Sequence, residues 1–185
     1  SGIIAMIMAV CHAHDEIIMP RNCHKSAINA LVLSGAKPIF IKPDYDYNLE
    51  IANQPTIEAY IAAMDENPKA RAIFVINPTY FGAVLDLKRL VVEAHSRRMI
   101  VLVDEAHGAH FGFNQYGPLS AMECGADVSA ISLHKTGGSL TQSSALLRQG
   151  DLVSHYDLSK ALATINTTSP STLLLASLDA SRKYM

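Results

Sequence analysis

MIVLVDEAH, residues 99–107, sets five apolar residues in a row before an acidic turn that contains a histidine. A strand that is apolar on consecutive residues is typical of a parallel sheet covered by helices on both faces. Similar short apolar runs recur along the chain in EIIMP (16–20), PIFIK (38–42), RAIFVINP (71–78) and DVSAISLHK (127–135). The sequence therefore predicts a buried, mainly parallel sheet.

Segments with helical periodicity alternate with these runs. We expect helices over Lys25–Leu33, closed by Gly35, over Thr56–Met64 and over Leu85–Arg98. A short helix is expected near residues 119–124, and SSALLRQG (143–150), which follows the last apolar run, is also expected to be helical. Five or more βα units predict the three-layer α/β/α class.

Both ends of the chain have helical patterns. GIIAMIMAV (2–10) is about half the roughly 20 residues that a membrane span needs, so it predicts a buried helix. STLLLASLDASRKYM (171–185) is the second such pattern. Because the chain begins and stops within them, and no linker divides it, we expect residues 1–185 to be one domain core from a longer protein.

The composition argues against several classes of function. The net charge is −2 and no basic block is present, so a nucleic-acid or anionic-membrane partner is not expected. The three cysteines form no CxxC pair and are odd in number, which predicts neither a disulfide framework nor a structural zinc site and favours a reducing cytoplasm. A site for a small molecule is the best remaining expectation.

Polar residues follow the apolar runs. They are RNCHKS (21–26), NPTYFG (77–82), DEAHGAH (104–110) and HKTGGS (134–139). In open α/β sheets, ligands bind beyond the carboxyl ends of the strands, so we expect these four segments to share one rim.

Lys135 and Asp104 stand out on this rim. A lone lysine is usually a solvated surface charge, but one that follows a buried strand and loses water becomes a nucleophile able to form an imine with an aldehyde. Asp104 ends a strand, where it is either a helix cap or a buried anion. An imine-forming lysine and an aspartate facing a ring nitrogen are the two groups that pyridoxal phosphate requires.

Other interpretations of these residues have weaker support in the sequence. DEAH also marks one class of helicases, but no GxxxxGK[ST] loop is present. His107 and His110 could share a metal ion, but no third ligand is apparent, so no metal is expected. His24 is either a structural histidine or a flat ring able to lie against a flat cofactor.

RNCHKS, NPTYFG, VDEAHGAH and SLHKTGGSLTQSS, in this order, resemble the Orn/Lys/Arg decarboxylase family of fold-type I pyridoxal-phosphate enzymes. The resemblance spans essentially the whole chain. It implies that Lys135 holds pyridoxal 5′-phosphate as an aldimine and that Asp104 faces the pyridine nitrogen. It also implies lesser roles: Ala106 packs on the ring, His107 lies near it, His24 stacks over it, Ser132 and His134 bind the phosphate, and Ser1 ends a phosphate-gripping stretch.

The resemblance further implies an activity, namely decarboxylation of arginine, lysine or ornithine to a polyamine or its precursor by a cytoplasmic homodimer or larger homo-oligomer. A smaller C-terminal domain would complete the site, so the fragment alone is expected to be inactive. Two alternatives stay open: another fold-type I reaction, such as that of an α-oxoamine synthase or aminotransferase, and a cofactor-free scaffold. GGSLTQSS (137–144) favours the decarboxylases.

Overall fold

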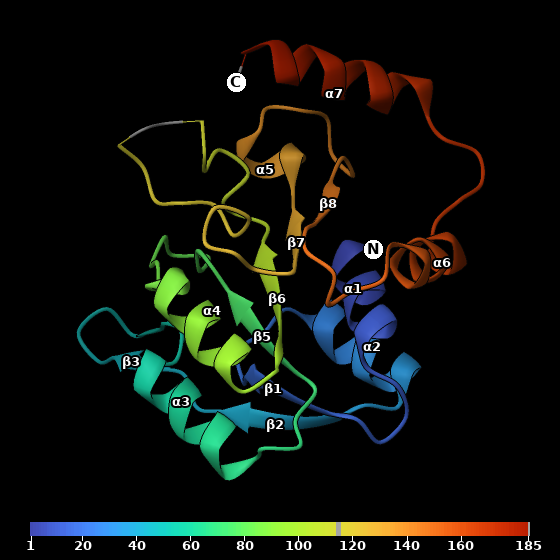
Figure 1. The fold of residues 1–185 in the computed structure, drawn as a ribbon. Coiled ribbons are helices and arrows are strands. Elements are labelled where there is room, and N and C mark those ends of the chain that lie inside the picture. Colours follow the sequence, from blue (N-terminus) through green and yellow to red (C-terminus); the bar gives the residue numbers. More distant parts are fainter. Residues whose placement is uncertain (114–115, 185) are drawn as a thin grey trace.

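The computed structural model describes residues 1–113 and 116–184, and within them a six-stranded sheet forms the middle of the molecule (Figure 1). Its strand order is β2-β1-β5-β6-β7-β8, with parallel pairing from β2 through β7 and β8 antiparallel to β7. The bounds are β1 Glu16–Pro20, β2 Lys37–Ile41, β5 Ala72–Ile76, β6 Ile100–Glu105, β7 Val128–Ile131 and β8 Ala145–Arg148. The expected mainly parallel sheet is confirmed.

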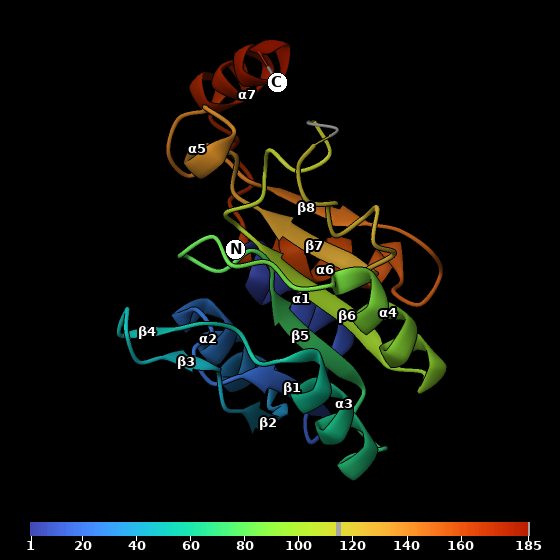
Figure 2. The same cartoon turned by 90° about the vertical axis from the view of Figure 1, so that its left-hand side faces the viewer.

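Helices cover both faces of this sheet (Figure 2). On one face lie α1 (Gly2–Val10), α2 (Lys25–Ser34) and α6 (His155–Ile165), and on the other lie α3 (Ile57–Glu66) and α4 (Leu87–Ser96). A small antiparallel ribbon, β3 (Tyr45–Asp46) with β4 (Ile51–Ala52), stands apart from the large sheet. The predicted three-layer α/β/α class is therefore confirmed.

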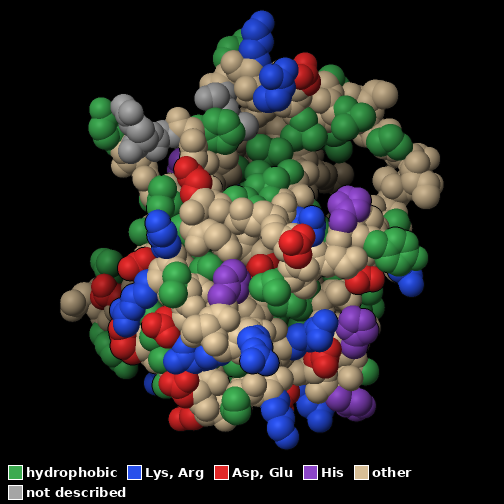
Figure 3. Space-filling view, in the orientation of Figure 1, with side chains coloured by type: hydrophobic (Ala, Val, Ile, Leu, Met, Phe, Trp, Pro, Cys, Tyr) green, Lys and Arg blue, Asp and Glu red, His purple; other side chains and the backbone are tan. Residues whose placement is uncertain are grey.

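The last helix, α7 (Thr172–Tyr184), lies apart from the three layers. Figure 3 shows hydrophobic side chains in a hollow between α7 and the rest of the molecule. Leu174 and Leu178 of α7 line the same cavity as Leu146 and Ile165. Within the described part of the chain, no helix is both long and apolar enough to cross a membrane.

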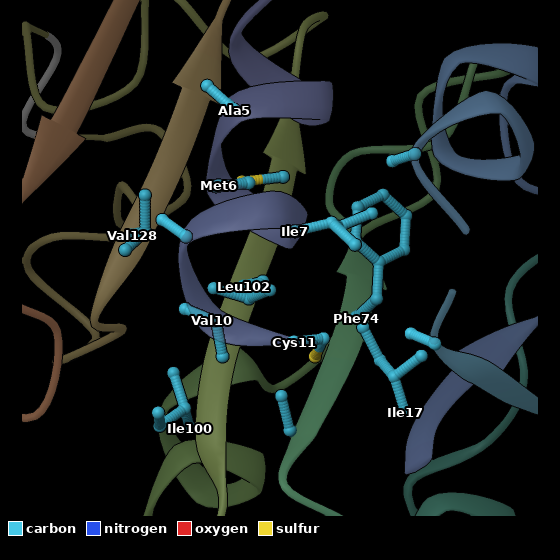
Figure 4. Close-up of a cluster of buried hydrophobic side chains, with 14 of the residues drawn as sticks. Ala5, Met6, Ile7, Val10, Cys11, Ile17, Phe74, Ile100, Leu102 and Val128 are labelled. Atoms are coloured by element: carbon cyan, nitrogen blue, oxygen red, sulfur yellow. The ribbon is translucent and has the colours of Figure 1, made fainter. Parts of the chain in front are cut away.

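Strand β6 shows why its consecutive residues are apolar. Successive side chains of a strand point to opposite faces. Ile100 and Leu102 join the cluster around α1, drawn in Figure 4, whereas Val101 and Val103 join the cluster around α3 and α4. Each such side chain, once fully buried, contributes about 1.5–3 kcal/mol to folding. The central strand is thereby held from both sides, which fixes where its carboxyl end lies.

The helix boundaries follow from local capping. Thr56, Asp86 and Ser154 each accept a hydrogen bond from a backbone N–H in the first turn of α3, α4 and α6. The predicted stop at Gly35 is confirmed, because this residue has φ +74°, a left-handed conformation that glycine adopts at low cost.

Two expectations about the second half of the chain are wrong. Residues 143–150 contain strand β8 instead of a helix. Without β8, strand β7 would be at the edge of the sheet with unpaired backbone groups, and the antiparallel pairing with β8 satisfies them. Residues 121–125 form turns instead of a short helix. There the Glu105 carboxylate accepts the Ala121 N–H at 2.8 Å, and Gly125, at φ +89°, turns the chain back towards β7.

Candidate active site

The carboxyl ends of β1, β5, β6 and β7 meet at a cavity of about 1430 Å³. Each of the four polar segments contributes to its wall, so the prediction of one shared rim is confirmed. The cavity is lined by all eight residues predicted to act in the site: Ser1, His24, Asp104, Ala106, His107, Ser132, His134 and Lys135.

Asp104 is the penultimate residue of β6 and is buried, with 5% of its surface exposed. Its Oδ1 accepts a hydrogen bond from the Ala106 N–H at 3.1 Å, while Oδ2 accepts none from any described residue. Burial raises the pKa of Asp104, and the Ala106 amide and the charges of Lys135 and His24 offset part of that rise. Glu105 ends β6 and residues 106–107 form a turn, so Asp104 does not cap a helix.

Lys135 lies on α5 (Leu133–Thr136), a single turn that follows β7. Its side chain is exposed, so the expectation of a lysine stripped of water is wrong for this structure. Instead, its Nζ lies 3.2 Å from Nε2 of His107. Burial and the charge of Lys135 lower the pKa of His107, which favours the neutral imidazole. Two bases in contact in this way can exchange one proton.

His24 caps a helix and also lines the cavity. Its Nδ1 caps α2 by accepting the Ser26 N–H at 3.2 Å, and it lies 2.8 Å from the Ser26 Oγ. Because Nδ1 is then an acceptor, the neutral ring carries its hydrogen on Nε2. The same ring lines the cavity, so the cap holds it at a defined place on the wall.

His134 is fastened to the segment that returns towards β8. Its backbone N–H and its Nδ1 both approach the carbonyl oxygen of Ser143, at 3.2 and 2.7 Å. A carbonyl only accepts, so Nδ1 carries a hydrogen and Nε2 donates only when the ring is protonated. His134 therefore fixes the backbone of Ser143 at the cavity wall.

The start of α1 adjoins this place. Ser1 lies at the cap position and makes no capping bond with its side chain. A Cβ added to Gly2 would lie 3.3 Å from the Cβ of Ala130, so the helix begins directly against β7. Its first N–H groups have no acceptor within the helix, which makes this end suitable for an anion.

Several residues that line the cavity were not predicted from the motifs. Tyr80, from NPTYFG, places its ring 5.3 Å from that of His107, edge to face. Its position after a strand was a usable signal. Ser143 and the α7 leucines had no such signal, because a long-range return of the chain brings them to the cavity.

The sequence matches known decarboxylases over 92–100% of its length. An arginine decarboxylase from Bacillus subtilis is 54% identical over 184 residues, which cover 100% of this chain and 38% of that protein. The lysine decarboxylase LdcA of Pseudomonas aeruginosa is 27% identical over 192 residues, covering 92% and 26%. This chain thus spans less than two fifths of the length of these relatives.

Solved structures agree in fold. Lysine decarboxylase A from Pseudomonas aeruginosa superimposes with a TM-score of 0.84 at 22% identity, covering 100% of this chain and 27% of that one. The constitutive lysine decarboxylase of Escherichia coli gives 0.78 at 20% identity, covering 96% and 26%. The three-layer arrangement is that of fold-type I enzymes. The family model described as Orn/Lys/Arg decarboxylase, major domain, matches residues 1–185, and the chain belongs to that family.

Proposed function

We propose that the protein containing this chain uses pyridoxal 5′-phosphate to decarboxylate a basic amino acid, with arginine as the preferred substrate. The observation that carries the proposal is the presence of Lys135 and Asp104 on one cavity, close enough for the lysine charge to act on the carboxylate. The names of the relatives at about 50% identity support arginine over lysine and ornithine.

The residues of the cavity fit this cofactor in their chemistry. They supply an accessible amine at Lys135, a buried carboxylate at Asp104 with one oxygen open, and a flat imidazole at His24. They also supply an anion-binding end at the start of α1. These features correspond to the aldehyde, the ring nitrogen, the ring face and the phosphate of pyridoxal phosphate.

When bound, pyridoxal phosphate supplies an aldehyde that bonds to amines and a protonated ring that takes up the electron pair left as carbon dioxide departs. Lys135 provides the amine that holds the cofactor. Asp104 keeps the ring nitrogen protonated, since a carboxylate beside a cation favours its charged form. The Ala106 N–H holds Asp104 by Oδ1, which leaves Oδ2 for that contact.

His107 serves the proton transfers of Lys135. Its lowered pKa favours the neutral ring, and in the tautomer that carries its hydrogen on Nδ1 the free Nε2 can take a proton from Nζ at 3.2 Å and return it. The Tyr80 ring packs against the imidazole, with the two ring planes perpendicular. Lys135 and His107 together supply the acid and the base that are needed when the substrate amine replaces the lysine amine and when the product carbon is protonated.

Recognition of the distal cation of the substrate requires residues beyond this chain. Asp104 is the one acidic residue among the described residues that line the cavity, and the proposal commits it to the ring. We therefore propose that residues 1–185 form the core of the cofactor-binding large domain, and that a further domain or a second copy completes the substrate pocket. A cytoplasmic homodimer or larger homo-oligomer is part of this proposal.

The test is an assay of the full-length protein with arginine, lysine and ornithine, measuring released carbon dioxide and the amine formed. The expected result is carbon dioxide with agmatine in equal amounts, fastest with arginine. Formation of an oxo acid without carbon dioxide, or condensation with an acyl thioester, would favour the other fold-type I reactions. A colourless protein that binds no pyridoxal phosphate would favour the scaffold.

A further inference from the structure

Ser143 has a hydroxyl without a partner at the wall of the cavity. The residue is 3% exposed, and its Oγ makes no hydrogen bond to any described residue. Leaving a buried polar group unsatisfied costs about 1–3 kcal/mol, so such groups are uncommon in folded proteins. Its backbone is well held, because His134 binds its carbonyl oxygen through both N and Nδ1. The unsatisfied atom is therefore not the result of a loose segment.

The surroundings of Ser143 suit an anion. The residue lies two positions before Ala145, which pairs with Ile131 at the carboxyl end of β7, next to Ser132. The start of α1 packs beside the same strands, since a Cβ on Gly2 would approach both Ala130 and Leu146. The first intrahelical bond of α1 runs from the Ala5 N–H to the Ser1 carbonyl, so the preceding N–H groups are open to an anion.

The cavity offers few cations for this anion. Among the described lining residues, Lys135 is the one lysine or arginine, and the proposed function commits it to the aldehyde. A neutral hydroxyl donor together with a helix N-terminus is a known way to bind phosphate without a cation. Turning the Ser143 side chain about its single Cα–Cβ bond gives it another staggered position without moving the backbone.

We propose that Ser143 binds the phosphate of the cofactor, donating a hydrogen bond from Oγ beside the start of α1. The inference rests on the proposed function and adds a ligand that the motifs did not assign. His134 has a positioning role in this proposal, because its imidazole holds the backbone of Ser143.

Ser139 offers a matched control. It lies on the same segment after Lys135, and its Oγ is also buried without a partner, but it does not line the cavity. A general effect of removing a buried serine hydroxyl would appear at both positions, whereas a phosphate contact is confined to Ser143.

The experiment titrates cofactor-free, full-length protein with pyridoxal 5′-phosphate and, separately, with pyridoxal, following absorbance. Ser143→Ala is expected to weaken binding of the phosphate compound about 10- to 100-fold, as for loss of a hydrogen bond to a charged group. Binding of pyridoxal and the midpoint of thermal unfolding of the cofactor-free protein should stay unchanged or improve, because an unsatisfied group is removed. Ser143→Thr, which keeps the hydroxyl, should retain most of the preference for the phosphate.

Three results would overturn the inference while leaving the proposed function intact. The first is that Ser143→Ala keeps the wild-type ratio of affinities for pyridoxal 5′-phosphate and pyridoxal. The second is that Ser143→Ala weakens binding of both compounds equally. The third is that Ser139→Ala weakens binding of pyridoxal 5′-phosphate as much as Ser143→Ala does. A wild-type protein that binds neither compound would instead overturn the proposed function, and the Ser143 inference with it.

Discussion

Nζ of Lys135 lies 3.2 Å from Nε2 of His107, although 28 residues separate them in the chain. The parallel pairing of β6 and β7 causes this approach, since Asp104 stands opposite Ala130 and Glu105 opposite Ile131. The turns that leave the two strands therefore rise side by side, one carrying a histidine and the other a lysine.

Replacing Lys135 with alanine should abolish decarboxylation, with a loss of about 10³-fold or more in kcat, because a covalent attachment point and a proton carrier disappear together. The visible absorption of the bound cofactor should disappear as well. Lys69→Ala, at an exposed lysine in a turn, is the control and should behave as wild type. Substantial activity in Lys135→Ala would contradict the assignment.

Replacing His107 with glutamine should lower kcat about 10²-fold, the usual contribution of one general acid or base. The lowered pKa of His107 means that the wild-type rate falls only when the pH drops below the ordinary histidine value of about 6.5. His107→Gln should lose that acid-side decline. His110→Gln, at an exposed histidine on the same turn, should keep it. An unchanged pH profile in His107→Gln would rule out the proton role.

Replacing Asp104 with asparagine should stabilise the cofactor-free protein while it weakens cofactor binding. Because the pKa of Asp104 is raised in the folded state, the native protein holds more protons than the unfolded chain, and its stability falls as pH rises above about 4. Asp104→Asn should remove that fall, with a gain at pH 8 of about 1–3 kcal/mol. Urea unfolding at several pH values measures it, with exposed Asp151→Asn as control. A loss of stability at pH 8 would contradict this assignment of the pKa shift.

Helix α7 should hold the segment that follows Lys135. The Ser181 Oγ donates to the Gly137 carbonyl, and the Ser177 Oγ accepts the Leu140 N–H at 3.3 Å. Ser177→Ala should speed hydrogen exchange at the Leu140 amide, and Ser177→Thr, which keeps the hydroxyl, should not. Ser159→Ala on α6 is the control. Unaltered exchange in Ser177→Ala would mean that α7 does not restrain this segment.

The sequence predicted the sheet and its rim well because burial on both faces leaves a local signature. Ile100 to Val103 are apolar without alternation, and the strand ends carry the polar segments. Strand β8 carried no such signature, since all four of its residues are only half-buried at an edge. Its conformation depends on a pairing partner distant in the chain, which no local pattern encodes.

The candidate site was predictable only in part, for a related reason. Asp104 and Lys135 follow strands directly, so their place on the rim could be predicted from the strand pattern. The exposure of Lys135 and its contact with His107 depend on how two turns pack. Ser143 lies at the cavity wall because the chain returns there to enter β8. That its buried hydroxyl has no hydrogen-bond partner among the described residues is visible only in three dimensions.

The attachment of the cofactor to Lys135 is best tested by reducing the full-length protein with borohydride after addition of pyridoxal 5′-phosphate, followed by mass spectrometry of its peptides. We expect a single stoichiometric phosphopyridoxyl group on the peptide that contains Lys135. Its absence from that peptide, or its presence at a different lysine, would show that Lys135 does not hold the cofactor.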